Sequence, residues 1–209
     1  MKNKYNVFLF DLDGTITDSA PGIMNSIRYA LDKMGEPIPE EAVLRKFIGP
    51  PLWQSFEEFC GLSKEKAEYA VKCYREYYKD NGIFENSLYP GVEEFIKSVK
   101  ASGKEVYLAT SKPTIFANRI LEYFDILKYF DGVVGSNLDG TMTDKAEIID
   151  AVLKMTSEKD LSRIIMFGDR NYDVIGAHKN GIACVGVLFG FGSREELSEA
   201  GAEYIVEGL

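Results

Sequence analysis

Four short apolar runs, separated by stretches with helical periodicity, limit the folds that this chain of 209 residues can adopt. Each run ends at a small or polar residue, as a buried strand does where it leads into a loop. The runs are residues 5–10, 105–109, 163–167 and 183–188, with weaker candidates at 132–135 and 203–206. Strands that alternate with helices favour a parallel sheet covered on both faces, so we expect an α/β fold with a Rossmann-like, three-layer core.

The segment from residue 18 to residue 87 breaks this alternation because it contains no convincing strand. Apolar residues such as Ile23 and Ile27 instead recur there at helical spacing. We therefore expect a core domain made of residues 1–17 and 88–209, with residues 18–87 inserted as an α-helical bundle.

The charge balance argues against two classes of partner. A net charge of −9 makes the chain a poor ligand for nucleic acids and anionic membranes, because it has no excess of cations to neutralise phosphate groups. Small phosphorylated molecules remain acceptable if basic groups or a metal ion are concentrated at one point. No apolar run is long enough to cross a bilayer, and the three cysteines are far apart, so we expect a cytoplasmic protein without disulfides.

Two aspartates, Asp11 and Asp13, follow the first strand and are followed by Gly14. Carboxylates so close together repel each other and must be offset by a cation or a shared proton. Gly14 lets the backbone turn sharply and approach a ligand. The motif alone also suits a turn with two solvated aspartates, but its position directly after an apolar strand favours a functional site.

A second acidic pair, Asp169 and Asp173, follows a later strand and opens a helix. The two residues are one helical turn apart, so both can face the strand ends, where ligands bind in open parallel sheets. Together with Asp11 and Asp13 they predict a cluster of hard oxygen ligands that suits Mg²⁺. The alternative is that the second pair only caps a helix at its positive end.

Two further segments supply groups that suit an anion. Thr110 and Ser111 offer a hydroxyl and backbone N–H groups at the start of a predicted helix, followed by Lys112. Lys145 lies in the first turn of another helix, where the dipole disfavours a cation unless a phosphate is near. Taken singly, these residues are better explained as an N-cap and an ordinary surface lysine.

These four motifs follow one another along the chain, each at a strand end or the start of the next helix. At this point the sequence resembles the haloacid dehalogenase superfamily of phosphatases, and the resemblance covers essentially the whole chain. The matching pieces are DLDGT at 11–15, Thr110, Lys145 and GDRNYD at 168–173. Three features resemble the phosphoglycolate phosphatase-like branch of this superfamily: the helical insert, TSKP at 110–113 and VGVLFGFG at 185–192. Ala146 departs from the pattern of that branch, in which proline commonly follows the lysine of the third motif.

The resemblance implies a chemical mechanism with two aspartates in different roles. Asp11 attacks phosphorus and forms an aspartyl-phosphate. Asp13 protonates the leaving alcohol and then deprotonates the water that hydrolyses the intermediate.

The resemblance also implies a ligand set. Mg²⁺ would be held by the side chains of Asp11 and Asp169, by the backbone carbonyl of Asp13, and by Asp173 through a water molecule. Phosphoryl transfer is catalysed mainly by positioning and charge neutralisation. The groups expected to bind the phosphoryl oxygens or the substrate are Thr110, Ser111, Lys145, Gly14 and Lys112.

The helical insert is expected to act as a mobile cap that closes over the site, excludes water and selects the leaving group. Arg45 and Gly49 are candidate substrate-binding residues in this insert. The aromatic residues of the insert, including Trp53, fit a packing or surface role better than a ligand site. His178, the only histidine, lies on a predicted helix away from the strand ends and is excluded from catalysis.

The expected substrate is a small phosphomonoester such as phosphoglycolate. A 5'-nucleotidase or pyrophosphatase on the same scaffold is the alternative, and a phosphonatase or phosphomutase is a more distant one. A phosphate-sensing receiver domain would have no use for Asp13, and a dehalogenase would need no carboxylate cluster. The sequence leaves open the physiological substrate and the oligomeric state, whether monomer or homodimer.

Overall fold

The computed structural model describes residues 3–209, which fold as two compact units. One unit joins residues 3–18 to Leu88–Leu209, and the other is Ser19–Ser87. Two short strands, β2 (Thr17–Asp18) and β3 (Ser87–Leu88), pair with each other at the two ends of the insert. Strands of two residues are too short to show a periodicity, so no sequence pattern predicts them.

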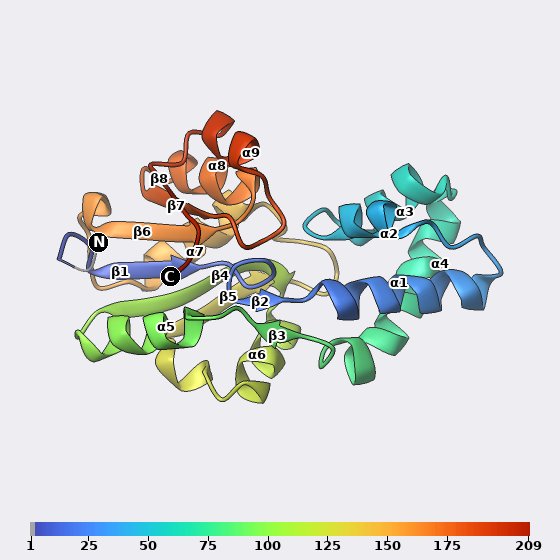
Figure 1. Ribbon diagram of the computed structural model, residues 1–209, viewed down its shortest axis with the longest axis horizontal. Helices are drawn as coiled ribbons and strands as arrows, with labels where there is room; N and C mark the ends of the chain where they lie inside the picture. The colour runs from blue at the N-terminus through green and yellow to red at the C-terminus, as the bar shows by residue number, and fades with distance from the viewer. Residues whose placement is uncertain (1–2) are drawn as a thin grey trace. The chain divides into compact units, whose positions relative to one another are not determined.

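A six-stranded parallel sheet in the order β5-β4-β1-β6-β7-β8 forms the centre of the first unit (Figure 1). The strands are β1 (Val7–Phe10), β4 (Glu105–Pro113), β5 (Gly132–Ser136), β6 (Ile164–Gly168), β7 (Ala183–Val187) and β8 (Tyr204–Val206). The predicted α/β fold with a parallel sheet and a helical insert is confirmed. Because β1 lies between β4 and β6, the strand order reverses beside it, and a ligand site is expected at that switch point.

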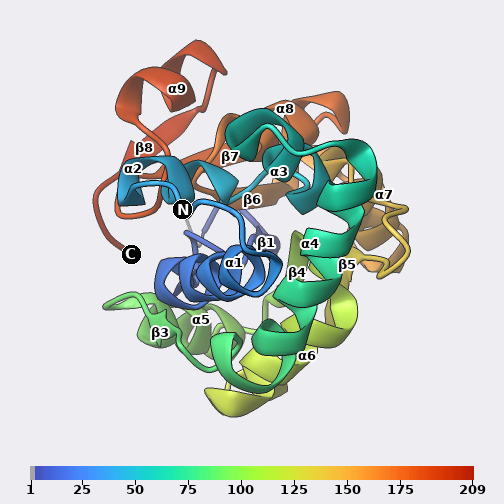
Figure 2. The same cartoon turned by 90° about the vertical axis from the view of Figure 1, so that its right-hand side faces the viewer.

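Helices cover both faces of this sheet, with α5 and α6 on one face and α7 and α8 on the other (Figures 1 and 2). The elements are α5 (Val92–Ala101), α6 (Thr114–Tyr123), α7 (Lys145–Met155), α8 (Asn171–Lys179) and α9 (Arg194–Glu199), with short 3₁₀ turns at Leu127–Tyr129 and Leu161–Arg163. These helices follow from the predicted periodicities, since their buried residues recur at helical spacing.

The side chains of β1 alternate between the two layers of the core. Val7 and Leu9 are fully buried in a cluster that also contains residues of α7 and α8. On the other face, the ring of Phe10 stacks on Phe167 of β6 at 4.9 Å, and both contact Phe95 of α5. Burying one such aromatic side chain stabilises the fold by about 1.5–3 kcal/mol. The strand that carries the first motif is therefore fixed on both faces.

The second unit is a helical bundle, as predicted. It contains α1 (Ala20–Met34), α2 (Glu41–Leu44), α3 (Leu52–Cys60) and α4 (Lys64–Tyr77), a 3₁₀ turn at Arg45–Phe47 and a π-helical turn at Tyr78–Gly82. Phe47 packs edge-on against Phe56 at 5.1 Å. A Cβ on Gly22 would lie 1.9 Å from the Gly82 carbonyl oxygen, so only glycine permits this approach of α1 to the π-helical turn. Trp53 is about half exposed, at 48%.

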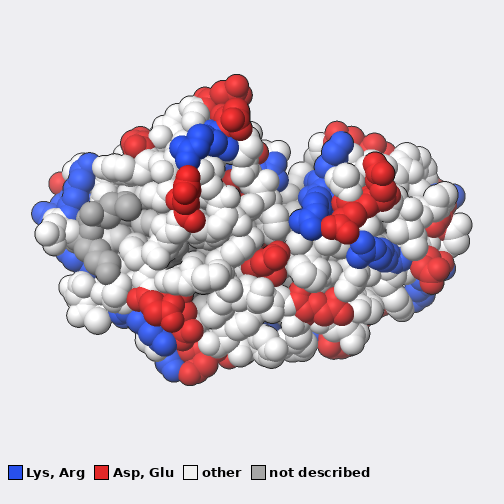
Figure 3. Space-filling view, viewed as in Figure 1, with Lys and Arg blue, Asp and Glu red and all other residues white. Residues whose placement is uncertain are grey.

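Acidic and basic side chains stand in small groups of both signs on the face shown in Figure 3. Ion pairs at the surface of the protein include Lys97 with Glu93 and Lys154 with Asp150. Cys60, Cys73 and Cys184 form no disulfide, as expected. Within residues 3–209, no helix has both the length and the apolar character needed to cross a membrane.

Strand β4 is longer than the sequence predicted, and this changes the setting of the third motif. The predicted strand ended at residue 109, whereas β4 continues to Pro113, with a shift of register against β5 between Thr110 and Pro113. The Ser136 hydroxyl donates a hydrogen bond to the Ser111 carbonyl at 2.8 Å, which holds this irregular end. The segment 110–113 is therefore a bulged strand end, and α6 begins at Thr114 with Pro113 as its N-cap.

Candidate active site

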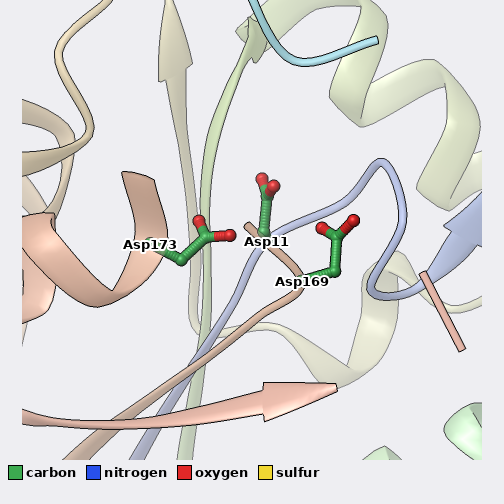
Figure 4. Close-up of side chains that lie close together, drawn as sticks. All are labelled: Asp11, Asp169 and Asp173. Atoms are coloured by element: carbon green, nitrogen blue, oxygen red, sulfur yellow. The ribbon is translucent and has the colours of Figure 1, made fainter. Parts of the chain in front are cut away.

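Three buried carboxylates gather at the carboxyl ends of the central strands. Asp11 follows β1, Asp169 follows β6, and Asp173 lies in the first turn of α8 (Figure 4). One ligand oxygen from each lies within 4.8 Å of the other two. Asp169 and Asp173 are almost completely buried. Residues that are 158 to 162 positions apart are thus joined because β1 and β6 are neighbours in the sheet.

Lys145 is the cation of this cluster. Its Nζ lies 2.8 Å from Asp11 Oδ1 and 2.9 Å from Asp173 Oδ1, and its side chain is only 5% exposed. It also donates a hydrogen bond to the Ala109 carbonyl at 3.1 Å. The position in the first turn of α7, which the helix dipole disfavours, is therefore explained by two carboxylates.

Neighbouring charges and burial shift the pKa values of these groups. Burial raises the pKa of Asp11 to about 6, against the opposing charge of Lys145 and with a further rise from Asp173. Burial also raises the pKa of Asp169 well above its ordinary value, and the charges of Asp173 and Asp11 add to the rise. For Lys145, burial by itself lowers the pKa, but the charges of Asp11 and Asp173 outweigh it and leave a raised pKa.

The charge balance of the cluster indicates which kind of ligand it suits. Three ionised carboxylates and one ammonium leave two negative charges in a buried setting. The raised pKa values of Asp11 and Asp169 show that their negative charges are unfavourable in this setting. The raised pKa of Lys145 shows that its positive charge is stabilised. A divalent cation would neutralise the remainder, and carboxylate oxygens are the donors that hard divalent ions prefer. The three residues thus fit a divalent metal site.

Asp169 is held in place by groups from two loops. Thr15 donates its hydroxyl to Asp169 Oδ1 at 3.3 Å, and the Phe191 backbone N–H donates to Oδ2 at 2.8 Å. Gly14 has a φ of +85°, and a Cβ there would lie 2.1 Å from Asp169 Oδ2. A Cβ on Gly190 would lie 2.4 Å from the Asp169 Cβ. Glycine is required at both positions because the backbone passes directly over the carboxylate.

Asp173 has two roles, which reconciles the two interpretations of the second acidic pair. Its Oδ2 accepts a hydrogen bond from the Arg170 backbone N–H at 3.1 Å, as a helix cap does. Its Oδ1 faces Lys145. A Cβ on Gly168 would lie 2.2 Å from the Asp173 side chain, so this glycine makes room for the carboxylate. Helix capping and membership of the cluster are therefore properties of one side chain.

Asp13 lies outside the three-carboxylate cluster and has its own cation. Lys112 Nζ lies 2.9 Å from Asp13 Oδ1 and 2.7 Å from Oδ2. Lys112, predicted on the substrate side, thus contacts the predicted acid–base residue directly. The expected metal contact of Asp13 was through its backbone carbonyl, and that stays a prediction.

The remaining predicted residues fall into two groups. In the first unit, the Thr110 hydroxyl lowers the pKa of Asp11 by hydrogen bonding, and the Ser111 hydroxyl donates to the Thr143 carbonyl at 3.4 Å. In the second unit, Arg45 is exposed and pairs with Glu41 at 2.7 Å, and Gly49 is exposed with a φ of +109°. Their substrate contacts stay predictions. His178 lies on α8, with its ring 3.1 Å from a Glu203 carboxylate oxygen.

The groups that orient Asp169 were not predicted from the sequence. Phe191 and the glycines on either side of it belong to the stretch 185–192, and Thr15 belongs to the motif 11–15. Both segments were used only for the family resemblance, and neither predicted a contact with Asp169. The one available signal was Gly190-Phe191-Gly192 shortly after a strand, since glycines at such a position permit a close approach of the backbone.

Comparison with known proteins gives matches over nearly the whole chain. The family model of haloacid dehalogenase-like hydrolases matches residues 8–187. A 5'-nucleotidase of Pseudomonas aeruginosa is 42% identical over 194 residues, which cover 93% of this chain and 87% of that protein. A phosphoglycolate phosphatase of Vibrio parahaemolyticus is 27% identical over 208 residues, which cover 96% of this chain and 91% of that protein. The crystal structure of a Clostridium difficile protein proposed to be a phosphatase matches with a TM-score of 0.91 and 49% identity, over 99% of this chain and 95% of that one.

Proposed function

This chain belongs to the haloacid dehalogenase-like hydrolase family and is a phosphatase of that family, and from this premise we propose that it is a Mg²⁺-dependent nucleoside 5'-monophosphate phosphatase. The observation that carries the catalytic part of the proposal is the buried cluster of Asp11, Asp169 and Asp173 around the Lys145 ammonium. It combines a carboxylate nucleophile with the charge needed to accept a phosphoryl group.

Asp11 is proposed as the nucleophile. Its carboxylate lies 2.8 Å from the Lys145 ammonium, and its pKa of about 6 before any metal binds leaves it mostly ionised at neutral pH. Attack on phosphorus forms an aspartyl-phosphate and releases the alcohol. Thr110, the Ser111 N–H and Lys145 are proposed to hold the phosphoryl oxygens as charge develops on them.

Asp13 is proposed as the general acid and base. It gives a proton to the ester oxygen as the P–O bond breaks, and it later takes a proton from the water that attacks the aspartyl-phosphate. Asp11, Asp169 and Asp173, with the Asp13 carbonyl, would hold Mg²⁺, and the bound ion would supply positive charge to the phosphoryl oxygens. Three carboxylates with two unbalanced negative charges suit a divalent ion, and Mg²⁺ is proposed because it binds oxygen ligands.

For the substrate, we place nucleoside 5'-monophosphates ahead of phosphoglycolate. The relative named for 5'-nucleotidase activity is 42% identical, whereas the one named for phosphoglycolate is 27% identical. The order of the two sequence-based hypotheses is thereby reversed, and a phosphoglycolate-like phosphomonoester becomes the second candidate. Arg45 and Gly49 stay proposed substrate-selecting residues, and Arg45→Ala is expected to change the ratio of kcat/KM between the two substrate classes.

The test is a phosphate-release assay on a panel of nucleoside 5'-monophosphates, 2-phosphoglycolate and p-nitrophenyl phosphate. Each is assayed with Mg²⁺, with EDTA, and with Asp11→Asn as the blank. We expect Mg²⁺-dependent turnover, with the highest kcat/KM for a nucleoside 5'-monophosphate. Higher kcat/KM for 2-phosphoglycolate would reverse the substrate order, and turnover that persists in Asp11→Asn would contradict the mechanism.

A further inference from the structure

An ion pair between Lys112 and Asp13 links the end of β4 to the loop after β1. The Lys112 Nζ lies within hydrogen-bond distance of both oxygens of the Asp13 carboxylate, at 2.9 and 2.7 Å. The Lys112 side chain is 6% exposed and that of Asp13 is 18% exposed. The pair is therefore largely shielded from water, unlike the exposed lysine pairs elsewhere on the protein.

The backbone on the lysine side of this pair is held on several sides. The Lys112 N–H donates to the Thr110 hydroxyl oxygen at 3.3 Å. A Cβ on Gly135 would lie 2.3 Å from the Lys112 carbonyl oxygen, so the absence of a side chain there lets β5 lie against this residue. The register shift in β4 falls at the same point. The irregular strand end thus fixes the direction from which the ammonium reaches Asp13.

The backbone on the aspartate side is equally constrained. Asp13 forms an isolated parallel bridge with Thr17, and the Gly14 N–H donates to the Thr17 carbonyl at 2.8 Å. With both backbones fixed, Lys112 determines the orientation of the Asp13 carboxyl group.

We propose that Lys112 is a positioning residue for proton transfer by Asp13, rather than a ligand of the substrate phosphate. The proposal rests on the proposed function, in which Asp13 is the general acid and base. In the first step, the ester P–O bond breaks as Asp11 bonds to phosphorus, and the proton of the Asp13 carboxyl group passes to the departing alcohol oxygen. In the second, the Asp13 carboxylate takes a proton from water, the resulting hydroxide bonds to phosphorus, and Asp11 is released as a carboxylate. Throughout, Lys112 stays bonded to one carboxyl oxygen while the other oxygen exchanges the proton.

The two roles of Lys112 predict different kinetics. A lysine that binds the phosphate serves every phosphate ester equally, so its loss lowers kcat/KM for all of them by a similar factor. A lysine that orients the acid matters only when the leaving group needs a proton. The parameter kcat/KM covers the steps up to departure of the alcohol, so it reports acid catalysis separately from hydrolysis of the intermediate.

The experiment compares Lys112→Met with the wild type on p-nitrophenyl phosphate, phenyl phosphate and adenosine 5'-monophosphate, all with Mg²⁺. General acid–base catalysis contributes typically 10²–10⁴-fold, so we expect kcat/KM for the nucleotide to fall by roughly 10-fold or more. For p-nitrophenyl phosphate, whose leaving group departs without a proton, we expect a change of less than about 3-fold, with phenyl phosphate in between.

Three controls separate positioning from general damage. Lys112→Arg keeps a cation and should recover part of the lost nucleotide activity. Lys97→Met removes an exposed lysine that pairs with Glu93 and should leave all three substrates unaffected. In the Asp13→Asn background, Lys112→Met should cause no further loss, because the two residues act through one step. Thermal unfolding of each variant checks the fold, and Lys112→Gln replaces Lys112→Met if the latter does not fold.

Equal losses on all three substrates, or no loss on any, would overturn the assignment while leaving the phosphatase proposal intact. A full further loss in the Asp13→Asn background would overturn it in the same way. If the wild-type protein turns over none of these esters with Mg²⁺, the proposed function fails first, and this inference fails with it.

Discussion

Replacing Asp11 with asparagine in the metal-free protein should remove a pH dependence of stability that the carboxylate cluster creates. Burial raises the pKa of Asp11 from its ordinary value of 3.8 to about 6, because Lys145 only partly offsets burial and the charge of Asp173. A group whose pKa is higher in the folded state binds its proton more tightly there. Its contribution to stability is complete below pH 3.8 and is lost as the pH rises through about 6.

The size of the effect follows from the shift. One pKa unit corresponds to about 1.4 kcal/mol, so the shift of Asp11 corresponds to about 3 kcal/mol over the whole window. Roughly half of that change falls between about pH 5 and 7.5, where the protein is easiest to study. Asparagine has no charge to bury, so the free energy of unfolding of Asp11→Asn should exceed that of the wild type increasingly as the pH rises.

The assay is urea unfolding of both proteins in EDTA at a series of pH values, with the difference in the free energy of unfolding as the readout. The pH dependence of groups outside the cluster cancels in this difference, whereas Asp169 and Lys145, whose pKa values the charge of Asp11 raises, contribute to it. Saturating Mg²⁺ should remove the disadvantage of the wild type, because binding at 100 times the dissociation constant adds about 2.7 kcal/mol to the protein that binds it. A difference that stays constant with pH in EDTA would show that the pKa of Asp11 is not raised in the folded protein.

Three further substitutions test separate parts of the structure. Lys145→Met leaves three buried carboxylates without their cation, so stability measured in EDTA should fall by about 3–5 kcal/mol and phosphate release should stop; a stable, active variant would be inconsistent with the ion pairs. Gly14→Ala places a Cβ where Asp169 Oδ2 lies and requires a φ of +85°, so Mg²⁺ affinity by calorimetry should drop about 10–100-fold, and unchanged affinity would rule out this close contact. Phe10→Ala removes a fully buried ring that stacks on Phe167, so the free energy of unfolding should fall by about 3–5 kcal/mol, and a loss below about 1 kcal/mol would show that the core is not packed as described.

Asp11, Asp169 and Asp173 could be predicted from the sequence because local patterns mark each of them. Asp11 and Asp169 directly follow apolar runs that are long enough to identify as strands. Asp173 follows Asp169 by four positions and lies in the first turn of α8, whose N-cap is Arg170. Since parallel strands end at one edge of the sheet, these local patterns were sufficient to expect the three carboxylates together.

The Lys112–Asp13 pair could not be predicted in the same way. The two residues are 99 positions apart, and their contact depends on β4 lying beside β1 and continuing past Thr110. Proline is common in the first turn of a helix, so Pro113 favours the prediction of a helix start over that of a bulged strand end. The contact of the Phe191 N–H with Asp169 is likewise set by the tertiary fold, because no periodic pattern marks a loop.

The identity of the substrate was also beyond the sequence taken alone. The motifs of the first unit determine the reaction, and they are the same for any phosphomonoester. Preference among esters depends on side chains outside these motifs, and no local pattern marks Arg45, which is proposed as one of them and is exposed in the helical bundle. The change of order between the two substrate hypotheses therefore came from a relative and not from the residues.

The proposed mechanism requires that Asp11 becomes phosphorylated at a site built from carboxylates that are distant in the chain. Mass spectrometry of the protein after acid quenching during turnover of adenosine 5'-monophosphate with Mg²⁺ tests this directly. We expect one phosphoryl group on the peptide that contains Asp11, absent in EDTA and in Asp11→Asn. A protein that turns over the nucleotide but carries the phosphoryl group on another residue would contradict it.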